Sequence, residues 1–483
     1  MMDMKNYSLW LENNKTKSCK KIDKDLNVDV LIVGGGITGL STLYHLKDSG
    51  LNTILVERNV CGQGVTSRST AKITYLQQNI YMNIRNYDTE VAVKYLKSQI
   101  DAVKLLTGII KKENINCDLK RVDSYIFTNK NSNIEKIKEE NTFLNSLGVK
   151  TEVLTNVPFN EKIKLSLKVS DTYVFHPLKY IYHLKNKFYD SIYEDSKVID
   201  VDKKKDYYIC NVNGYKVKAK YIVIATHYPY FLLPFMLPMK SHIETSYIGV
   251  KKNKEYLNIS AINIDKPTIS LRYHSDDKNN YLIYLYNSYK SANIKSIKSN
   301  FDKLNKKYKF NYIWSNKDII SNDYIPFIGS TDINYDTFFI ACGYNTWGIS
   351  NGTLAGKIIS DIILKNNNPY IDLFNPYRKV NISKLFRFPV DLTCNIKAII
   401  KSTKNNVNNS KVIYKKIDNK DVAIYIDNKG KEHIVLNKCP HMKCGLVFND
   451  VEKTWDCLCH GSRFDIDGKC IEGPSNHNIA FKK

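Results

Sequence analysis

The 483-residue chain contains 43% hydrophobic and 12% aromatic residues, enough for sizeable hydrophobic cores, and its length predicts two or three domains. Its formal net charge of +24 comes almost wholly from lysine, since only eight of its 72 basic residues are arginine. These lysines are scattered among asparagines rather than gathered in a stripe, which is typical of a solvated surface and argues against a nucleic-acid-binding protein.

The sequence predicts a cytoplasmic protein without a membrane span. Residues 1–28 lack the continuous apolar run and the cleavage site of a signal peptide, and no run of about 18 apolar residues occurs. The stretch FLLPFMLPM, Phe231–Met239, is too short and contains two prolines. Five of the eleven cysteines lie between Cys439 and Cys470, so we expect a local metal site rather than the disulfide framework of a small secreted domain.

The first motif lies in VDVLIVGGGITGLSTLYHLKDSGLNTILVER, residues 28–58. An apolar strand ends at Val33, glycines follow in GxGxxG spacing, and helical periodicity continues to Leu46. The glycines are Gly34, Gly36 and Gly39. In this spacing they make the tight turn, admit a pyrophosphate close to the backbone and let the helix pack on the strand. A second strand, Thr53–Val56, is followed by Glu57, whose carboxylate can accept hydrogen bonds from the two hydroxyl groups of a ribose. We infer a dinucleotide site; the alternative is an ordinary glycine-rich turn.

Two later segments favour FAD over NAD. KAKYIVIATHYPY, Lys218–Tyr230, predicts a strand whose end looks like the ATG-type strand end of two-dinucleotide-fold flavoproteins. DTFFIACGYNTWGISNGTLAGKIISDII, residues 336–363, resembles the closing FAD motif of the D-amino-acid oxidase-like family, in which a helix dipole faces the isoalloxazine ring. VTSRSTAKIT, Val65–Thr74, and DYIPFIGS, Asp323–Ser330, extend the resemblance.

The motif and the resemblance together imply an FAD site. Its expected cofactor-binding residues are Gly34, Gly36, Ile37, Thr38, Gly39, Glu57, Arg58, Thr66, Thr70, Ala71, Lys72, Ala225, Thr226, Gly343, Trp347 and Gly348. Between these segments, HPLKYIYHLKNKFYDSIYEDSKVIDV predicts a helix from Pro177 to about Tyr193, followed by a strand that returns to the FAD-binding domain.

The C-terminal region predicts an all-β module. Polar sequence with NNVNNS, Asn405–Ser410, is typical of a linker. Beyond it, VIYKKI, VAIYI and HIVL are short β-rich runs separated by turn residues such as DNKD and DNKG. The cysteine cluster therefore lies on the loops of this module.

The cluster has the spacing of a Rieske [2Fe-2S] centre. Cys439-x-His441 is followed after fifteen residues by Cys457-x-x-His460, and in Rieske centres two thiolates hold one iron and two imidazoles the other. A structural zinc site is the alternative, but zinc sites usually use repeated CxxC or HxxxH pairs. Cys470 is expected to be an inert strand residue.

Rieske proteins of the respiratory and photosynthetic type supply further expectations by resemblance. Cys444 and Cys459 occupy the places of the disulfide that ties the two cluster loops together. Ser462 matches a hydroxyl that hydrogen-bonds a cluster sulfide in high-potential members, whereas Phe464 stands where those members carry a tyrosine. We therefore expect a potential below the top of the Rieske range. Gly473-Pro474 fits the loop that covers the cluster.

The chain resembles, over nearly its full length, a bacterial family of FAD oxidoreductases of the glycine/D-amino-acid oxidase type fused to a C-terminal Rieske domain. The resemblance implies an α/β FAD-binding domain of the two-dinucleotide-binding, glutathione-reductase-like class, an α+β substrate domain and a small all-β Rieske domain. The expected boundaries are 1–400 for the oxidoreductase, 401–410 for the linker and 411–483 for the Rieske domain. Within the oxidoreductase, the FAD-binding parts are expected at about 28–76, 172–230 and 322–365, and the substrate domain at about 77–171 and 231–321.

The substrate is less well defined. Amino-acid oxidases of this fold tend to carry an arginine shortly before the P-D-G-x-P-x-I-G stretch, and this arginine binds the substrate carboxylate. In this chain Asp318 stands at about the position of that arginine. Arg272 could replace that arginine, although a surface salt-bridging role is favoured. His227, Tyr228 and His274 are candidates near the flavin face, each favoured as structural, and no catalytic base is assigned.

These features predict an FAD-dependent dehydrogenase that acts on a small amine, amino acid or similar molecule. Flavin accepts two electrons together and the cluster carries one, so a tethered cluster can pass electrons from flavin to an external one-electron acceptor or donor protein. One alternative is an electron-transfer flavo-iron-sulfur protein without an organic substrate, which the missing carboxylate anchor favours. A nucleic-acid-binding or tRNA-modifying flavoprotein is suggested only by the charge.

Overall fold

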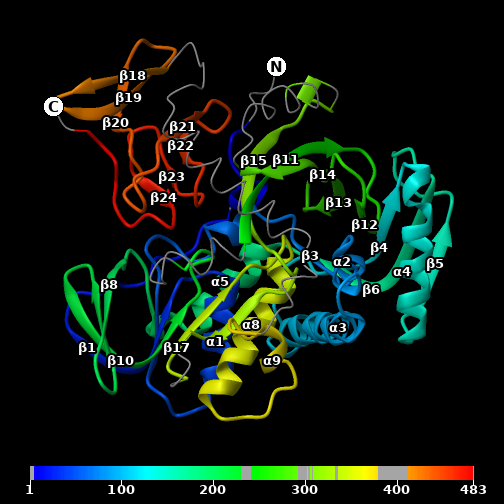
Figure 1. The fold of residues 1–483 in the computed structure, drawn as a ribbon, viewed down its shortest axis with the longest axis horizontal. Helices are drawn as coiled ribbons and strands as arrows, with labels where there is room; N and C mark the ends of the chain where they lie inside the picture. Colours follow the sequence, from blue (N-terminus) through cyan, green and yellow to red (C-terminus); the bar gives the residue numbers. More distant parts are fainter. Residues whose placement is uncertain are drawn as a thin grey trace.

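Two large sheets with flanking helices and a separate β-module make up the fold (Figure 1). The computed structural model describes residues 5–12, 14–229, 241–291, 302, 305–306, 308–331, 336–378 and 412–481. The expected linker at 401–410 lies outside these residues. The β-module, orange to red in Figure 1, lies beside β15 and β11 and above the first sheet.

The first sheet has the order β16-β17-β10-β1-β2-β7, and β9 and β8 extend it from β10. Its strands are β1 (Leu26–Val33), β2 (Thr53–Val56), β7 (Ile192–Tyr193), β8 (Val198–Lys203), β9 (Tyr208–Val212), β10 (Tyr215–Ile224), β16 (Phe327–Ser330) and β17 (Phe338–Cys342). The centre, β17-β10-β1-β2-β7, is parallel. In parallel sheets of this kind ligands bind beyond the carboxyl ends of the strands, which here are Val33, Ile224 and Cys342.

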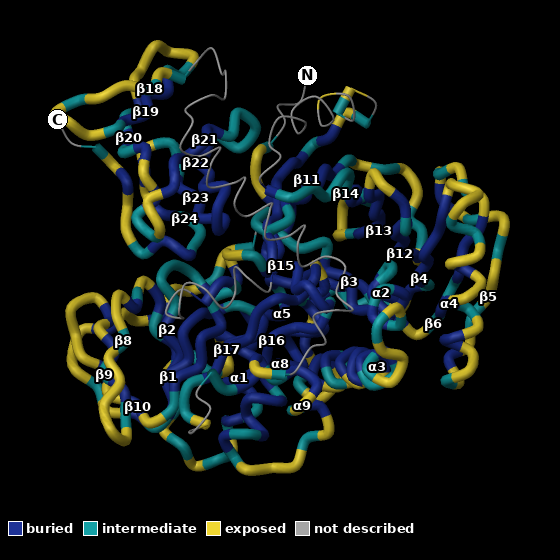
Figure 2. The backbone as a smooth tube through the Cα atoms, viewed as in Figure 1, coloured by how far each residue is buried: buried dark blue, intermediate teal, exposed yellow. Residues whose placement is uncertain are grey.

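Helices cover this sheet closely. They are α1 (Ile37–Leu46), α5 (Pro177–Lys187), α8 (Gly348–Ile363) and α9 (Ile371–Phe374). Helix α8 can approach α1 because Gly352 and Gly356 face it: a Cβ atom on Gly356 would lie 2.5 Å from Ser41. Figure 2 shows the tube buried through β1, β17, α1 and α8 and exposed along the β8–β9 hairpin.

Helix α5 is shorter than the sequence predicts. The helix was expected to reach about Tyr193, but it ends at Lys187 and is followed by the 3-10 turn η4 (Tyr189–Ser191). Ile192 and Tyr193 instead pair with Leu55 and Val56 of β2. The pairing satisfies the backbone of these two residues in the parallel sheet, which overrides their helical periodicity.

The second sheet has the order β15-β11-β14-β13-β12-β4-β6-β3, with β5 paired to β6. Its strands are β3 (Lys72–Ile73), β4 (Lys120–Thr128), β5 (Thr151–Leu154), β6 (Leu165–Val174), β11 (Ser241–Asn253), β12 (Ile259–Asn263), β13 (Ile269–Ser275), β14 (Asn280–Lys290) and β15 (Tyr312–Ser321). The accompanying helices are α2 (Ile80–Arg85), α3 (Thr89–Lys112) and α4 (Ile134–Ser146). Among the described residues, no helix is long and apolar enough to cross a membrane.

The β-module consists of two small sheets. They contain β18 (Val412–Ile417), β19 (Lys420–Ile426) and β20 (Glu432–Leu436), then β21 (Leu446–Asn449), β22 (Thr454–Cys457), β23 (Arg463–Phe464) and β24 (Cys470–Glu472). Aromatic stacking joins them: the ring centroids of Tyr425 and Phe448 lie 4.1 Å apart, and those of Phe448 and Trp455 lie 4.8 Å apart. This core holds the loops on either side of β21 and β22 in fixed positions.

Strand β15 lies between part of a cavity and part of the β-module. Alternate residues of a strand point to opposite faces. Asn316 and Asp318 line the cavity, whereas Ser315 and Lys317 face the module: Ser315 Oγ accepts a hydrogen bond from Arg463 at 2.6 Å, and Lys317 Nζ donates to the carbonyl of Gly461 at 3.0 Å. A single strand layer therefore lies between the cavity and the second cysteine-histidine loop.

Candidate functional site

The turn after β1 can be built only with glycine at two positions. Gly34 has a φ of +113°, and a Cβ atom there would lie 2.6 Å from the carbonyl oxygen of Ala225 at the end of β10. A Cβ atom on Gly39 would lie 2.0 Å from the carbonyl oxygen of Gly34. Helix α1 then begins directly after Gly36. Its N-terminus meets the open end of the parallel sheet, the arrangement that accepts a pyrophosphate.

The carboxylate of Glu57 closes this turn from the next strand. It accepts hydrogen bonds from the backbone N–H groups of Gly35 at 2.8 Å and Asn59 at 2.9 Å. These bonds fix the carboxylate at the edge of the cavity, which Glu57 also lines. The placement is the one expected for an acid that accepts from ribose hydroxyls.

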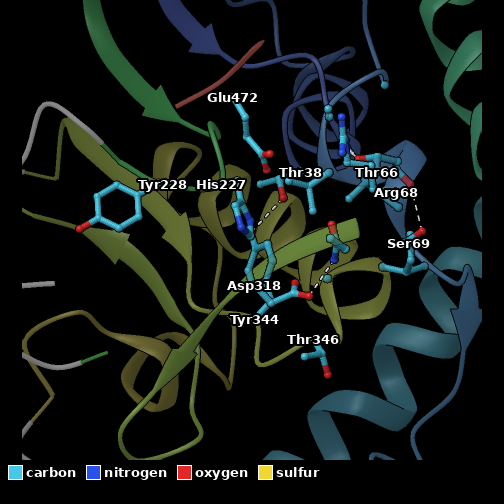
Figure 3. Close-up of a pocket in the computed structure, with 18 of the residues that line it drawn as sticks. Thr38, Thr66, Arg68, Ser69, His227, Tyr228, Asp318, Tyr344, Thr346 and Glu472 are labelled. Atoms are coloured by element: carbon cyan, nitrogen blue, oxygen red, sulfur yellow. Dashed lines mark hydrogen bonds between the residues drawn. The ribbon is translucent and has the colours of Figure 1, made fainter. Parts of the chain in front are cut away.

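One cavity extends from the glycine turn to the inner faces of β11 and β15, and Figure 3 shows part of its wall. The expected cofactor-binding residues that line it are Gly34, Gly36, Ile37, Thr38, Glu57, Arg58, Thr66, Thr70, Ala71, Lys72, Ala225, Thr226, Trp347 and Gly348. Gly39 and Gly343 do not line it. Gly39 packs on Gly34, and Gly343 packs against the ring of Phe327, 3.0 Å from where its Cβ would be. These two glycines shape the fold around the cavity instead.

The β-module also contributes to the cavity wall, which the sequence did not indicate. Ile471, Glu472 and Gly473 line it, and Figure 3 shows the side chain of Glu472 reaching toward His227. Arg58 Nη2 donates to the carbonyl of Ile471 at 3.0 Å and ties the two parts together. The contact joins residues 413 positions apart, so no local pattern could reveal it.

Replacing Gly34 with alanine is expected to abolish most FAD binding. The new methyl group would overlap the backbone at Ala225 and occupy a left-handed conformation, so the turn has to move. We expect the FAD content of the purified protein to fall to roughly a tenth of the wild-type value, measured by absorbance of the flavin released on denaturation.

Gly108→Ala is the matched control, because Gly108 lies in α3 and its Cβ would meet nothing within 4 Å. Alanine in a helix interior is favoured over glycine by about 1 kcal/mol, so this variant should keep its flavin. Full FAD content in the Gly34→Ala protein would contradict the assigned role of the turn.

The two cysteine-histidine loops bring together the donor set of a [2Fe-2S] cluster. The thiols of Cys439 and Cys457 are buried and hydrogen-bonded to each other. The rings of His441 and His460 lie with centroids 5.0 Å apart, and the Nδ1 atoms of both are buried without a hydrogen-bond partner. Burial lowers the pKa of His460 to about 4, so its imidazole stays neutral. Two thiols and two unpartnered ring nitrogens on adjoining loops fit a Rieske cluster.

A disulfide joins Cys444 to Cys459 and ties the two loops together. The sulfur atoms of Cys444, Cys457 and Cys459 all lie within 4.8 Å of one another. Because the disulfide occupies two of the three sulfurs, only Cys457 of this group can ligate metal as a thiolate. Ser462 is fully buried between the loops, and its Oγ accepts a hydrogen bond from the backbone N–H of Ser475 at 2.9 Å.

Tyr228 connects the histidine edge of this centre to the cavity. Its ring centroid lies 6.2 Å from that of His441 and 5.8 Å from that of His460, and Tyr228 and His227 both line the cavity. Figure 3 shows the Tyr228 ring pointing away from the middle of the cavity, while His227 lies near Tyr344 and Asp318.

Arg272 is neither a surface residue nor a cavity residue, which corrects both interpretations drawn from the sequence. Its exposed fraction is 1%, and Nη1 donates to the carbonyls of Thr70, Ala71 and Phe175. Backbone acceptors therefore fix it as a structural brace. His274 is likewise buried, against Trp10, and lies outside the cavity wall.

Comparisons with known proteins agree with both halves of the chain. A family model described as FAD dependent oxidoreductase (DAO) matches residues 29–362, and one described as Rieske [2Fe-2S] domain matches residues 398–482. YhfW of Bacillus subtilis (strain 168), which carries the name of a Rieske 2Fe-2S iron-sulfur protein, is 27% identical over 487 residues, covering 96% of this chain and 95% of that protein. Gamma-glutamylputrescine oxidoreductase of Escherichia coli (strain K12) is 20% identical over 376 residues, covering 72% of this chain and 87% of that protein.

Solved structures share the fold of the first part. Glycine oxidase from Geobacillus kaustophilus matches with a TM-score of 0.61 at 14% identity, covering 74% of this chain and all of that one. L-proline dehydrogenase from P. horikoshii matches with a TM-score of 0.59 at 15% identity, covering 73% of this chain and 98% of that one. The first family model spans well over half of the sequence, so the chain belongs to the FAD dependent oxidoreductase (DAO) family and carries a C-terminal Rieske domain, with FAD and a [2Fe-2S] cluster as its cofactors.

Proposed function

We propose that the protein is a dehydrogenase that oxidises a small amine or amino-acid-like substrate and passes the electrons one at a time to an external acceptor. The observation that carries this proposal is the placement of the two centres. The histidine edge of the Rieske site contacts Tyr228, which also lines the cavity. Lys317 of β15, the strand whose Asn316 and Asp318 line the cavity, donates to the carbonyl of Gly461 beside the cluster ligand His460. Electron tunnelling falls steeply with distance, so such proximity favours direct transfer.

In this proposal each part of the chain has a defined task. The turn from Gly34 to Gly36 and the start of α1 hold the pyrophosphate. Cys439 and Cys457 hold one iron, and His441 and His460 hold the other through Nδ1. When bound, FAD supplies the two-electron acceptor for the substrate, and the cluster supplies one-electron transfer.

The overall reaction balances with two molecules of a one-electron acceptor. The substrate loses two electrons and two protons, its carbon–nitrogen single bond becomes a double bond, and each acceptor molecule gains one electron. The neighbourhood of His441 is the proposed exit: this residue is half-buried, and the next residue, Met442, is 39% exposed. An acceptor that docks there would approach the ligand edge of the cluster.

Anaerobic reduction tests the proposal. The holoprotein is mixed with a panel of small amines and amino acids, flavin bleaching is followed by absorbance, and the reduced cluster is followed by EPR. We expect at least one compound to bleach the flavin, with the EPR signal of a reduced Rieske cluster appearing afterwards. No bleaching by any organic compound, together with bleaching by reduced electron carriers, would overturn it.

A second candidate is an electron-transfer flavo-iron-sulfur protein without an organic substrate. The observation that favours it is the aspartate, Asp318, at about the position where related amino-acid oxidases tend to carry a carboxylate-binding arginine. The same experiment separates the two, because only the second candidate predicts bleaching by reduced carriers alone.

A further inference from the structure

One segment of the β-module, Ile471–Gly473, lies in the wall of the cavity that the FAD motifs also line. Hydrogen bonds hold it against the FAD-binding part of the chain from both of its ends. At its start, Arg58 Nη2 donates to the carbonyl of Ile471 at 3.0 Å. Just beyond its end, Lys197 Nζ donates to the carbonyl of Asn476. The segment is therefore a fixed part of the wall and belongs to the Rieske domain.

The order of the strands gives the direction in which a bound FAD crosses this region. Glu57, the acid suited to the ribose, follows β2, and the glycine turn that suits the pyrophosphate follows the neighbouring β1. On the other side of β1 lies β10, which ends just before His227, and then β17, which leads to α8. The N-terminus of α8 is the part expected to face the isoalloxazine ring. The ribityl chain, which joins the pyrophosphate to the ring, is therefore expected on the β10 side of the turn.

The segment Ile471–Gly473 reaches from one of these sides to the other. Its first residue is bonded to Arg58, which directly follows the ribose acid on the β2 side. The side chain of Glu472 instead reaches toward His227, on the β10 side (Figure 3). The segment thus extends past the glycine turn, and its carboxylate lies on the side where the ribityl chain is expected.

The carboxylate of Glu472 has an unsatisfied acceptor. Among the described residues, its buried Oε2 atom has no hydrogen-bond partner. The Nε atom of Arg463 lies 3.9 Å away, beyond hydrogen-bond distance, and lies 3.1 Å from Asp456, to which it donates. A buried acceptor without a donor costs free energy. Because Glu472 lines the cavity, a ligand in the cavity can supply the missing donor.

Positive charges keep this carboxylate ionised. Burial alone would raise the pKa of Glu472, but Arg463, Arg68 and Lys317 hold it below its ordinary value. An ionised carboxylate can only accept hydrogen bonds, and the bonds that it accepts are stronger than those between neutral groups. The pyrophosphate of FAD offers acceptors at its oxygens, whereas the ribityl chain carries hydroxyl donors. The ribityl chain is therefore the part of FAD that matches Glu472.

We propose that Ile471–Gly473 of the Rieske domain is part of the FAD site, and that Glu472 accepts a hydrogen bond from a ribityl hydroxyl group. FAD binding and docking of the Rieske domain are then coupled, and each stabilises the other by the same free energy. The cluster is held most firmly beside the cavity when FAD is bound. This inference goes beyond the proposed function and holds whatever the substrate is.

Titration of the deflavinated full-length protein with FAD tests the contact. Binding is followed by flavin fluorescence, and iron and sulfide analysis checks that the cluster is intact. We expect Glu472→Ala to raise the Kd of FAD about tenfold or more, because a hydrogen bond to a charged group is lost. The FAD content of the purified protein stays high as long as FAD exceeds its Kd, so the titration is the measurement that reports the change. ADP lacks the ribityl chain, and its Kd, read from competition with FAD, should stay unchanged.

Glu432→Ala is the matched control, because Glu432 is an exposed glutamate at the start of β20 in the same module. This variant should bind FAD as the wild type does. A Kd of FAD in Glu472→Ala within twofold of wild type, or an equal loss of affinity for FAD and ADP, would overturn the contact with the ribityl chain.

Hydrogen exchange in the wild-type protein tests the coupling without any substitution. We expect the backbone amides of residues 470–476 to exchange about tenfold more slowly with FAD bound than in the deflavinated protein. Strand β18, Val412–Ile417, does not line the cavity and should exchange equally in both forms. Equal exchange of residues 470–476 in the two forms would overturn the coupling, even if the Glu472→Ala protein failed to fold.

Discussion

Replacing Cys457 with serine should give a protein that binds FAD but holds no iron–sulfur cluster. Cys457 is 2% exposed and its thiol lies against that of Cys439, so the change leaves one iron with a single thiolate. A serine hydroxyl is not ionised at neutral pH and cannot replace the lost ligand. We expect iron and acid-labile sulfide to fall to roughly a tenth of the two atoms of each that a [2Fe-2S] cluster contains.

The same variant should separate the two halves of the reaction. Electron delivery to an external one-electron acceptor should fall about 100-fold or more, whereas light-driven reduction of the flavin should proceed as in the wild type. The measurements are iron and sulfide analysis, EPR after dithionite, and flavin absorbance.

Cys470→Ser is the control for this prediction. Cys470 is also buried in the β-module, but its thiol contacts the carbonyls of Glu472 and Ser475, which a serine hydroxyl can also reach. This protein should retain its cluster. If Cys457→Ser kept full iron and sulfide, or if the wild-type protein contained zinc without sulfide, the assigned ligand set would be wrong.

The features that the sequence predicted best are those built from short segments. The glycine turn at Gly34, the strand pair around Glu57 and the two cysteine-histidine loops each depend on residues a few positions apart. Backbone geometry at such distances is set by local chemistry, such as the positive φ of Gly34. The structure places these segments at the cavity and at the loops of the β-module, and it forms the Cys444–Cys459 disulfide that the resemblance implies.

The features that the sequence could not reveal depend on contacts between distant segments. Arg272 was expected to form a salt bridge at the surface, yet carbonyls from Thr70, Ala71 and Phe175 enclose it. Glu472 reaches the cavity only because the β-module docks on the first part of the chain. The end of α5 was misplaced because pairing with β2 competes with helical periodicity.

The docking surface itself is charged and buried. Arg463 is fully buried, lies 3.1 Å from both Asp456 and Glu452, and donates to Ser315 of β15. Lys317 of β15 lies 3.4 Å from Asp456. Burial alone would raise the pKa of Asp456, but Arg463 and Lys317 hold it well below its usual value. A buried network of this kind gains little over apolar packing, but it is costly to break from one side, so it favours one fixed position of the module.

Lys317→Met is therefore expected to loosen the docking of the Rieske domain on β15, while the domain keeps its [2Fe-2S] cluster. Methionine keeps much of the length of the lysine side chain beside Gly461. It removes the hydrogen bond to the carbonyl of Gly461 and the positive charge that faces Asp456. Arg463 still pairs with Asp456 within the module. Iron, sulfide and FAD contents should stay at wild-type levels. Electron transfer from photoreduced flavin to the cluster, timed by absorbance in an anaerobic flash experiment, should slow about tenfold or more because the average separation of the two centres increases.

Lys252→Met is the control, because Lys252 is an exposed lysine on β11, and this change should leave the rate unchanged. A rate in Lys317→Met within twofold of wild type would mean that the charged contacts across β15 do not hold the two centres together, and that another part of the interface sets their distance.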